Sequence, residues 1–160
     1  MNLSPHFTYS EMVRTTSGIP NNPTPEQVER LRHLCLFLLE PIRTIMGVPV
    51  DVSSGFRTPE VNAAVGGKVN SQHMCLGPWA AADIWVRGTT PRDLALFIVT
   101  NRMVVIEYDQ VIIEPTWVHV SYSSVHNRME LLQRDTSSPT GYSVPSFGPV
   151  GTGRAEHHTP

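Results

Sequence analysis

Residues 117–122 are Trp-Val-His-Val-Ser-Tyr, and this short stretch carries the clearest information about the fold. Side chains alternate between the two faces of a β-strand, so the two valines share one face while Trp117, His119 and Ser121 share the other. The alternation predicts a strand with one apolar and one polar face.

A long amphipathic helix is predicted well before this strand. Thr24 is a typical N-cap residue, and Gln27 completes a capping-box pattern with it. Apolar residues then recur at helical spacing. We expect a kink at Pro41 and the end of the helix at Gly47.

Shorter elements surround the long helix. A short helix capped by Ser10 is predicted at the start of the chain. Strands are predicted at residues 48–53, 81–86, 104–108, 110–114 and 117–122, and helices at residues 59–65 and 91–101. This order predicts an α+β fold in which helices pack on one side of a central, mostly antiparallel sheet.

The composition changes at about Arg134, after which proline, glycine and serine dominate. Such a segment has too few apolar side chains to fold by itself. We therefore divide the chain into a folded domain, residues 1–133, and an extended C-terminal arm, residues 134–160. Four apolar residues are the expected anchors of the arm on another subunit or across the domain: Tyr142, Val144, Phe147 and Val150.

The overall composition excludes several classes of protein. A formal charge of −2 over 160 residues argues against nucleic acid as the main partner. No apolar run approaches the length of a membrane span, and the N-terminus lacks the pattern of a signal peptide. The two cysteines do not form a disulfide framework. We expect a protein made in a reducing cytoplasm.

Three polar side chains occupy positions where a buried strand or its edge would normally be apolar. Asp83 lies among alanines, with His73 before it and His119 after it. A buried carboxylate is costly unless it is paired or binds a metal, and two imidazoles with one carboxylate are a common ligand set for catalytic zinc. A single histidine in a strand is more often a hydrogen-bonded core residue, so both interpretations stay open for each histidine alone.

Four short motifs carry a resemblance to a known family. They are SSGFRTPEVNAAVGG at residues 53–67, SQH at 71–73, AADI at 81–84 and WVHVSY at 117–122. In this order they resemble the zinc D-alanyl-D-alanine carboxypeptidase family, over about residues 3–122. That family includes VanX- and VanY-type peptidases and phage L-alanyl-D-glutamate endopeptidases, and the hedgehog signalling domain resembles its fold.

The resemblance implies a site and an activity. It places a Zn²⁺ ion on His73, Asp83 and His119, and it gives Arg57 the task of steadying negative charge on the substrate or transition state. The implied activity is hydrolysis of peptidoglycan stem peptides, as a D,D-carboxypeptidase or an L,D-endopeptidase. A phage-related lysin acting at the bacterial cell wall or within a virion fits this activity.

Two features depart from the family pattern. Nine residues separate His73 from Asp83, more than is usual in the family, and the extra loop either leaves both ligands in place or disturbs the cleft. Many relatives carry an acid where this chain has Thr116. We take Glu114 as the general base, with a solvated strand-end residue as the alternative interpretation. Glu107 and Asp109 are weaker candidates.

Two other functions remain as alternatives. Cys75 lies close to His73 and suggests thiol catalysis or an additional zinc ligand. The second alternative is a structural component of a phage particle that keeps the peptidase fold with weak or no activity. In that case the C-terminal arm would bind other particle subunits.

Overall fold

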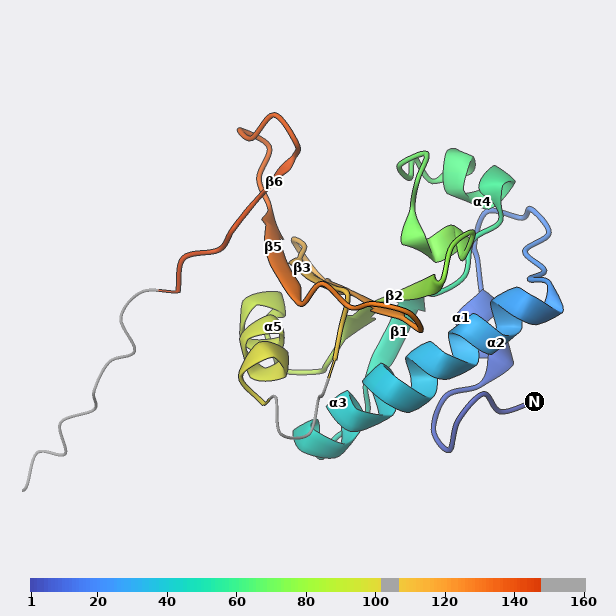
Figure 1. Ribbon diagram of the computed structural model, residues 1–160, viewed down its shortest axis with the longest axis horizontal. Helices are drawn as coiled ribbons and strands as arrows, with labels where there is room; N and C mark the ends of the chain where they lie inside the picture. Colours follow the sequence, from blue (N-terminus) through green and yellow to red (C-terminus); the bar gives the residue numbers. More distant parts are fainter. Residues whose placement is uncertain (102–106, 148–160) are drawn as a thin grey trace, which may run out of the picture.

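The computed structural model describes residues 1–101 and 107–147, and its centre is a six-stranded sheet (Figure 1). The strands lie in the order β1-β2-β4-β3-β5-β6. Of the five neighbouring pairs, four are antiparallel and only β3 and β5 run parallel. The strand bounds are β1 Asp51–Ser54, β2 Trp79–Trp85, β3 Gln110–Ile113, β4 Val118–Ser123, β5 Glu130–Arg134 and β6 Tyr142–Ser143.

Helices cover the apolar face of this sheet. α2 packs on β2 and β4, and α5 packs on β3 and β4. The helical segments are α1 Tyr9–Val13, α2 Pro25–Leu34, the π-helical turn η1 Cys35–Leu39, α3 Glu40–Met46, α4 Pro59–Ala64, the 3-10 turn η2 Gln72–Met74 and α5 Pro91–Thr100. Within the described residues, no helix has the length and apolarity needed to cross a membrane. The predicted α+β fold is confirmed.

The two faces of the sheet differ in polarity, as the alternation in residues 117–122 predicts. Ala82, Val120 and Val111 form one cross-strand row that belongs to the buried apolar core. The adjacent row pairs Asp83 with His119 and points to the opposite face. We call this opposite side the open face of the sheet, and it carries the candidate site.

The long helix follows its sequence signals closely. Thr24 and Gln27 form the predicted capping box, and Gly47 ends the helix with a φ of 67°. The irregularity expected at Pro41 takes the form of the π-helical turn Cys35–Leu39. Proline has no N–H to donate, and its ring clashes with the carbonyl four residues earlier, so the widened turn accommodates it.

The cap predicted for the first helix was wrong by two residues. Thr8, rather than Ser10, is the N-cap of α1, and its Oγ1 accepts a hydrogen bond from the Glu11 N–H at 3.2 Å. The Glu11 carboxylate accepts the Thr8 N–H in return. Ser and Thr are both good caps, and the reciprocal partner at Glu11 decides between them.

The predicted strands at residues 48–53, 81–86, 110–114 and 117–122 correspond to β1, β2, β3 and β4. The strand predicted at residues 104–108 falls largely on residues 102–106, which lie outside the described residues. Strands β5 and β6 were not predicted. β5 pairs with β3, which lies earlier in the chain, and β6 pairs with Gln133 and Arg134 at the polar end of β5. Neither strand has a clear apolar pattern of its own.

The predicted boundary at residue 133 falls near the end of β5, and the first part of the arm pairs with that strand. Tyr142 in β6 lies opposite Arg134 in β5. Val144 is 78% exposed, and the ring of Phe147 lies under the Arg92 guanidinium, 4.6 Å from centroid to Cζ. Val150 lies outside the described residues, and the division into domain and arm stays a prediction.

The loop after β1 passes very close to α1. The Phe56 N–H donates to the Met12 carbonyl oxygen at 2.7 Å. A Cβ added at Gly55 would lie 2.3 Å from that same oxygen, so only glycine fits here without a backbone shift. This contact fixes the start of the SGFR segment against the N-terminal helix.

We therefore expect Gly55→Ala to lower the free energy of unfolding by about 1–3 kcal/mol, as overpacking usually does. Urea denaturation measures this loss, and hydrogen exchange of the Phe56 amide locates it, because the shift should break the bond to Met12. Gly18→Ala is the matched control: its φ is 73° with nothing within 4 Å of an added Cβ, so it should add local strain only. Equal protection of the Phe56 amide in both variants would show that the contact is not tight.

Candidate metal centre and active site

The candidate site lies on the open face of the sheet, where three elements meet. β2 supplies Asp83, β4 supplies His119, and the cross-strand register places the two directly opposite each other. His73 comes from the turn η2, which packs against β2. The site therefore depends on two strand neighbours and one turn held above them.

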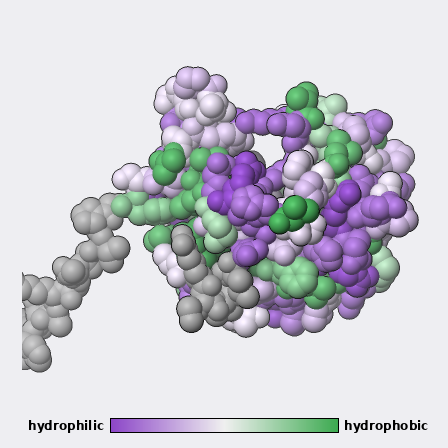
Figure 2. Space-filling view, in the orientation of Figure 1, coloured by the Kyte–Doolittle hydropathy of each residue, from purple (hydrophilic) through white to green (hydrophobic). Residues whose placement is uncertain are grey.

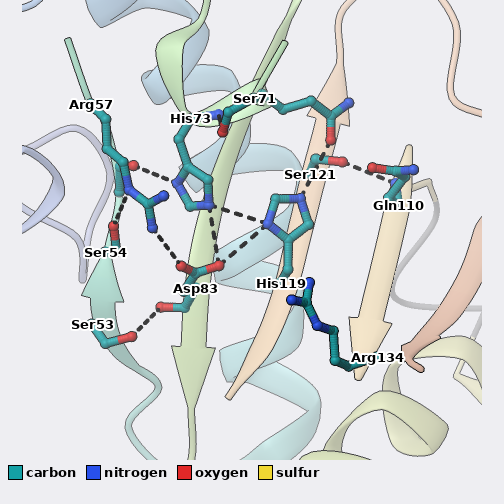
Figure 3. A network of polar contacts seen from close by, with 12 residues as sticks. Ser53, Ser54, Arg57, Ser71, His73, Asp83, Gln110, His119, Ser121 and Arg134 are labelled. Atoms are coloured by element: carbon teal, nitrogen blue, oxygen red, sulfur yellow. Dashed lines mark hydrogen bonds and ion pairs between the residues drawn. The ribbon is translucent and has the colours of Figure 1, made fainter. Parts of the chain in front are cut away.

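Three ligand atoms converge on one point (Figure 3). His73 Nε2 lies 3.2 Å from Asp83 Oδ1, and His119 Nδ1 lies 3.3 Å from the same oxygen and 3.2 Å from His73 Nε2. A tetrahedral ion with bonds of about 2.0–2.1 Å has neighbouring ligands about 3.3–3.4 Å apart. The triangle of ligand atoms therefore has the size that a tetrahedral metal ion requires.

Both histidines are held so that a lone pair faces this point. The His73 Nδ1–H donates to the Gly55 carbonyl oxygen at 2.7 Å, which leaves Nε2 toward Asp83. The His119 Nε2–H points to Gln72 Oε1 at 3.4 Å, which leaves Nδ1 toward Asp83. In a metal-binding histidine, one ring nitrogen typically donates its N–H to a protein acceptor, which leaves the lone pair of the other ring nitrogen for the metal.

Burial and mutual contact set the protonation states of the cluster. Although burial by itself would raise the pKa of Asp83, the imidazoles of His73 and His119 hold that pKa far below its ordinary value. Burial lowers the pKa of His119 below its ordinary value. An ionised carboxylate with a neutral imidazole is the combination that binds a metal ion.

Arg57 holds the second oxygen of the aspartate. Its Nη2 lies 3.0 Å from Asp83 Oδ2, and its Nε–H donates to Ser54 Oγ at 2.9 Å. Asp83 thus presents only Oδ1 to the imidazoles. Arg57 Nη1 has no hydrogen-bond partner within residues 1–101 and 107–147, and the side chain lines the cleft beside the site.

Gln72 was not recognised in the sequence as a functional residue, although it lies next to His73. Besides facing His119, its Nε2 donates to Asp109 Oδ2 at 2.6 Å, and Arg128 Nη2 lies 2.7 Å from that carboxylate oxygen. This chain of contacts fixes the amide so that its oxygen faces the imidazole. Its position before the motif histidine was the only available signal.

The Asp109 carboxylate is too fully bonded to serve as a general base. Besides Gln72, the Arg128 backbone N–H and Nε–H donate to it at 3.1 and 2.9 Å. Burial by itself would raise the pKa of Asp109, yet these bonds lower it. Glu107 accepts a hydrogen bond from Asn127 Nδ2 and does not line the cleft.

Glu114 is the free carboxylate of the cleft. It follows β3 directly, and its side chain has no hydrogen bond or ion pair to any residue that the structure describes. Burial raises the pKa of Glu114 above its ordinary value. Thr116, where many relatives of the resembled family carry an acid, lines a smaller neighbouring pocket with Arg57 and Asp83.

The long loop between His73 and Asp83 leaves both side chains in place. Arg30 Nη1 and Gln27 Nε2 donate to the carbonyl oxygens of Cys75 and Met74, so the loop is tied to helix α2. The Cys75 thiol is buried outside the cleft, and burial raises its pKa to about 12. A protonated, enclosed thiol of this kind does not act as a nucleophile.

We expect Gln72→Leu to weaken metal binding by about 10–100-fold, because His119 loses the acceptor that orients its ring. Titration with Zn²⁺ under competition from a chelator measures the affinity. Gln110→Leu is the matched control, since Gln110 also lines the cleft but its amide bonds Glu130 instead. If the two variants bind Zn²⁺ equally well, Gln72 does not position His119.

The site opens into a cleft of about 1130 Å³, which is large enough for a short peptide. A search of curated proteins finds no match to the chain. Residues 5–121 match the family described as Peptidase M15, and this span contains His73, Asp83, His119 and Glu114. The match confirms the resemblance to the zinc D-alanyl-D-alanine carboxypeptidases, and the chain belongs to the peptidase M15 family.

Proposed function

We propose that this protein is a zinc peptidase that hydrolyses a peptide bond in the stem peptides of peptidoglycan. The observation that carries the proposal is the convergence of His73 Nε2, Asp83 Oδ1 and His119 Nδ1 at mutual distances of 3.2–3.3 Å. The chain's membership of a metallopeptidase family supports it. The cleft beside the cluster gives an extended peptide access to it.

The chemistry of the donor set fits zinc better than a harder ion. Two imidazole nitrogens and one carboxylate oxygen are typical of catalytic zinc, whereas Mg²⁺ and Ca²⁺ prefer oxygen ligands throughout. His73, Asp83 and His119 would hold the ion, with Gly55 and Gln72 orienting the imidazoles. When bound, Zn²⁺ acts as a Lewis acid that makes water a better nucleophile and a carbonyl carbon a better electrophile.

Glu114 supplies the proton transfers. As the free carboxylate of the cleft it accepts a proton from the attacking water and delivers it to the leaving amine. Its burial raises its pKa, which makes the carboxylate a stronger base than an exposed glutamate. Asp83 and Asp109, the other carboxylates that line this cleft, are engaged with cations or imidazoles.

Arg57 acts on both the protein and the peptide. Its Nη2 fixes Asp83 Oδ2, and its Nη1 is left to donate to the carbonyl oxygen on which negative charge develops. The side chain is held in this position by Ser54, so little reorganisation is needed when the charge appears.

A purely structural role in a phage particle would require none of these arrangements. Nothing in residues 1–101 and 107–147 points to particle subunits, whereas two oriented imidazoles and a free, half-buried carboxylate serve hydrolysis. The enzyme is therefore the function that the site supports best.

The first test is metal content. We expect the purified protein to bind about one Zn²⁺ per chain, because the three ligands form a single site, and His119→Ala to lose it. Mass spectrometry of the metal and calorimetric titration measure both results. His126→Ala is the matched control, because His126 lines the same cleft outside the cluster. Zinc retained in His119→Ala but lost in His126→Ala would place the metal elsewhere.

The second test separates binding from chemistry. We expect Glu114→Gln to keep its zinc while turnover of stem peptides falls by a factor on the order of 10² or more, because the amide cannot accept the proton. Steady-state kinetics on D-alanyl-D-alanine and L-alanyl-D-glutamate peptides measure kcat. Glu107→Gln is the control and should keep its activity. The opposite pattern, a loss in Glu107→Gln alone, would transfer the role of base to Glu107.

A further inference from the structure

Two cations line the cleft without an acidic partner. Arg57 is paired with Asp83, and Arg128 is paired with Asp109. Lys68 and Arg134 also line the cleft, yet neither forms an ion pair with any described carboxylate. Figure 2 shows an opening in this part of the surface, bordered largely by hydrophilic residues.

The side chain of Tyr142 brings these two cations together. Lys68 Nζ lies 4.1 Å from the centroid of the Tyr142 ring, and Arg134 Cζ lies 5.4 Å from it. Arg134 Nη1 donates to the Tyr142 hydroxyl at 3.3 Å. The three residues come from the loop after α4, from β5 and from β6, and all three line the cleft. We call these three residues the cationic corner.

Hydrogen bonds and close packing hold the backbone of the cationic corner. The buried Asn62 donates its Nδ2–H to the Lys68 carbonyl oxygen at 2.9 Å, and the Ser71 N–H donates to the same oxygen at 3.0 Å. A Cβ at Gly67 would lie 2.0 Å from Asn62 Oδ1, so glycine is needed for this packing. On the other side, the pairing of Arg134 with Tyr142 sets the position of the arginine.

The corner lies close to the proposed catalytic groups. β5 runs parallel to β3, and its register with β3 carries Arg134 level with Glu114, one position beyond the last paired residues. Both Lys68 and Arg134 act electrostatically on Glu114 and oppose the rise in its pKa. Figure 3 shows the Arg134 side chain extending toward the His119 side of the cleft.

We propose that Lys68, Arg134 and Tyr142 form a subsite that binds a carboxylate of the peptide substrate. Two cations that both contact Tyr142, together with its phenol hydroxyl, offer several charge-assisted donors to an anion, and the arginine supplies its donors in a planar fork. The inference rests on the proposed function only in taking a stem peptide as the substrate. Such a peptide carries carboxylates at its C-terminus and on its glutamate residue.

The subsite makes the enzyme selective for acidic peptides. A carboxylate held here lies within a few residues of the bond presented to His73, Asp83 and His119, because β5 is two strands away from β4 at about 4.8 Å per strand. Binding energy from this contact positions the scissile carbonyl. A peptide with a carboxamide at the same place loses the charge-assisted bonds and binds less tightly.

Equilibrium binding to the full-length, zinc-loaded Glu114→Gln protein tests this, because that protein does not consume its ligand. The probes are two matched pairs: acetyl-D-alanyl-D-alanine with its C-terminal amide, and L-alanyl-D-glutamate with L-alanyl-D-glutamine. We expect at least one carboxylate to bind about tenfold more tightly than its carboxamide, and the pair that shows this identifies the source of the anion.

The preference should disappear when Lys68→Met and Arg134→Met are added. Arg87→Met, which removes an exposed cation away from the cleft, should leave it intact. Because the double change also removes contacts to Tyr142, a charge-keeping pair, Lys68→Arg with Arg134→Lys, should restore the preference and exclude a merely structural role. Thermal unfolding confirms that each variant is folded.

Three outcomes would overturn the subsite. They are equal binding of both members of each pair, a preference that survives in the folded double variant, and no binding of any of the four peptides. Since none of these measurements requires hydrolysis, an inactive wild-type protein that still prefers carboxylates would contradict the proposed function and leave the subsite standing.

Discussion

The buried negative charge of Asp83 is the constraint on which the rest of the structure depends. A carboxylate that is 6% exposed on a sheet surface must be compensated by opposite charge or by a metal ion. Arg57 compensates one oxygen, and the other faces two imidazoles at 3.2 and 3.3 Å. The lone pairs of His73 and His119 point at the same place as that oxygen, so the cluster is fully satisfied only when a cation occupies it.

The strand register and the packing of the turn η2 hold Asp83, His119 and His73 at fixed distances from one another. Strand register places Asp83 beside His119, while the alternate residues Ala80 and Ala82 face the core, where their small side chains let helix α2 pack closely on β2. The turn that carries His73 is tied to the loop after β1, since the Arg57 N–H donates to the His73 carbonyl oxygen at 2.9 Å. The strand pairing and this hydrogen bond therefore order the site and also join separate parts of the domain.

The sequence was sufficient to predict the elements whose signals are local. Alternation predicted β4, capping residues predicted the start of α2, and an aspartate set among alanines marked the site. It could not predict β5, whose partner β3 lies earlier in the chain, or β6, which is a short polar strand paired with β5, nor the roles of Gln72 and Lys68. The amide of Gln72 matters only through the imidazole it faces, and Lys68 matters only through its place opposite Tyr142 and Arg134. These contacts join residues that are far apart in the sequence, so no periodic sequence pattern indicates them.

The most direct test of the metal centre is anomalous diffraction at the zinc edge from crystals of the purified protein. One anomalous peak is expected, bonded to His73 Nε2, Asp83 Oδ1 and His119 Nδ1 at about 2.0–2.2 Å, with the His119 Nε2–H still facing Gln72. A peak at any other place, or a zinc ion bound through His119 Nε2, would contradict the account, because the proposed zinc site depends on the orientation of both imidazoles.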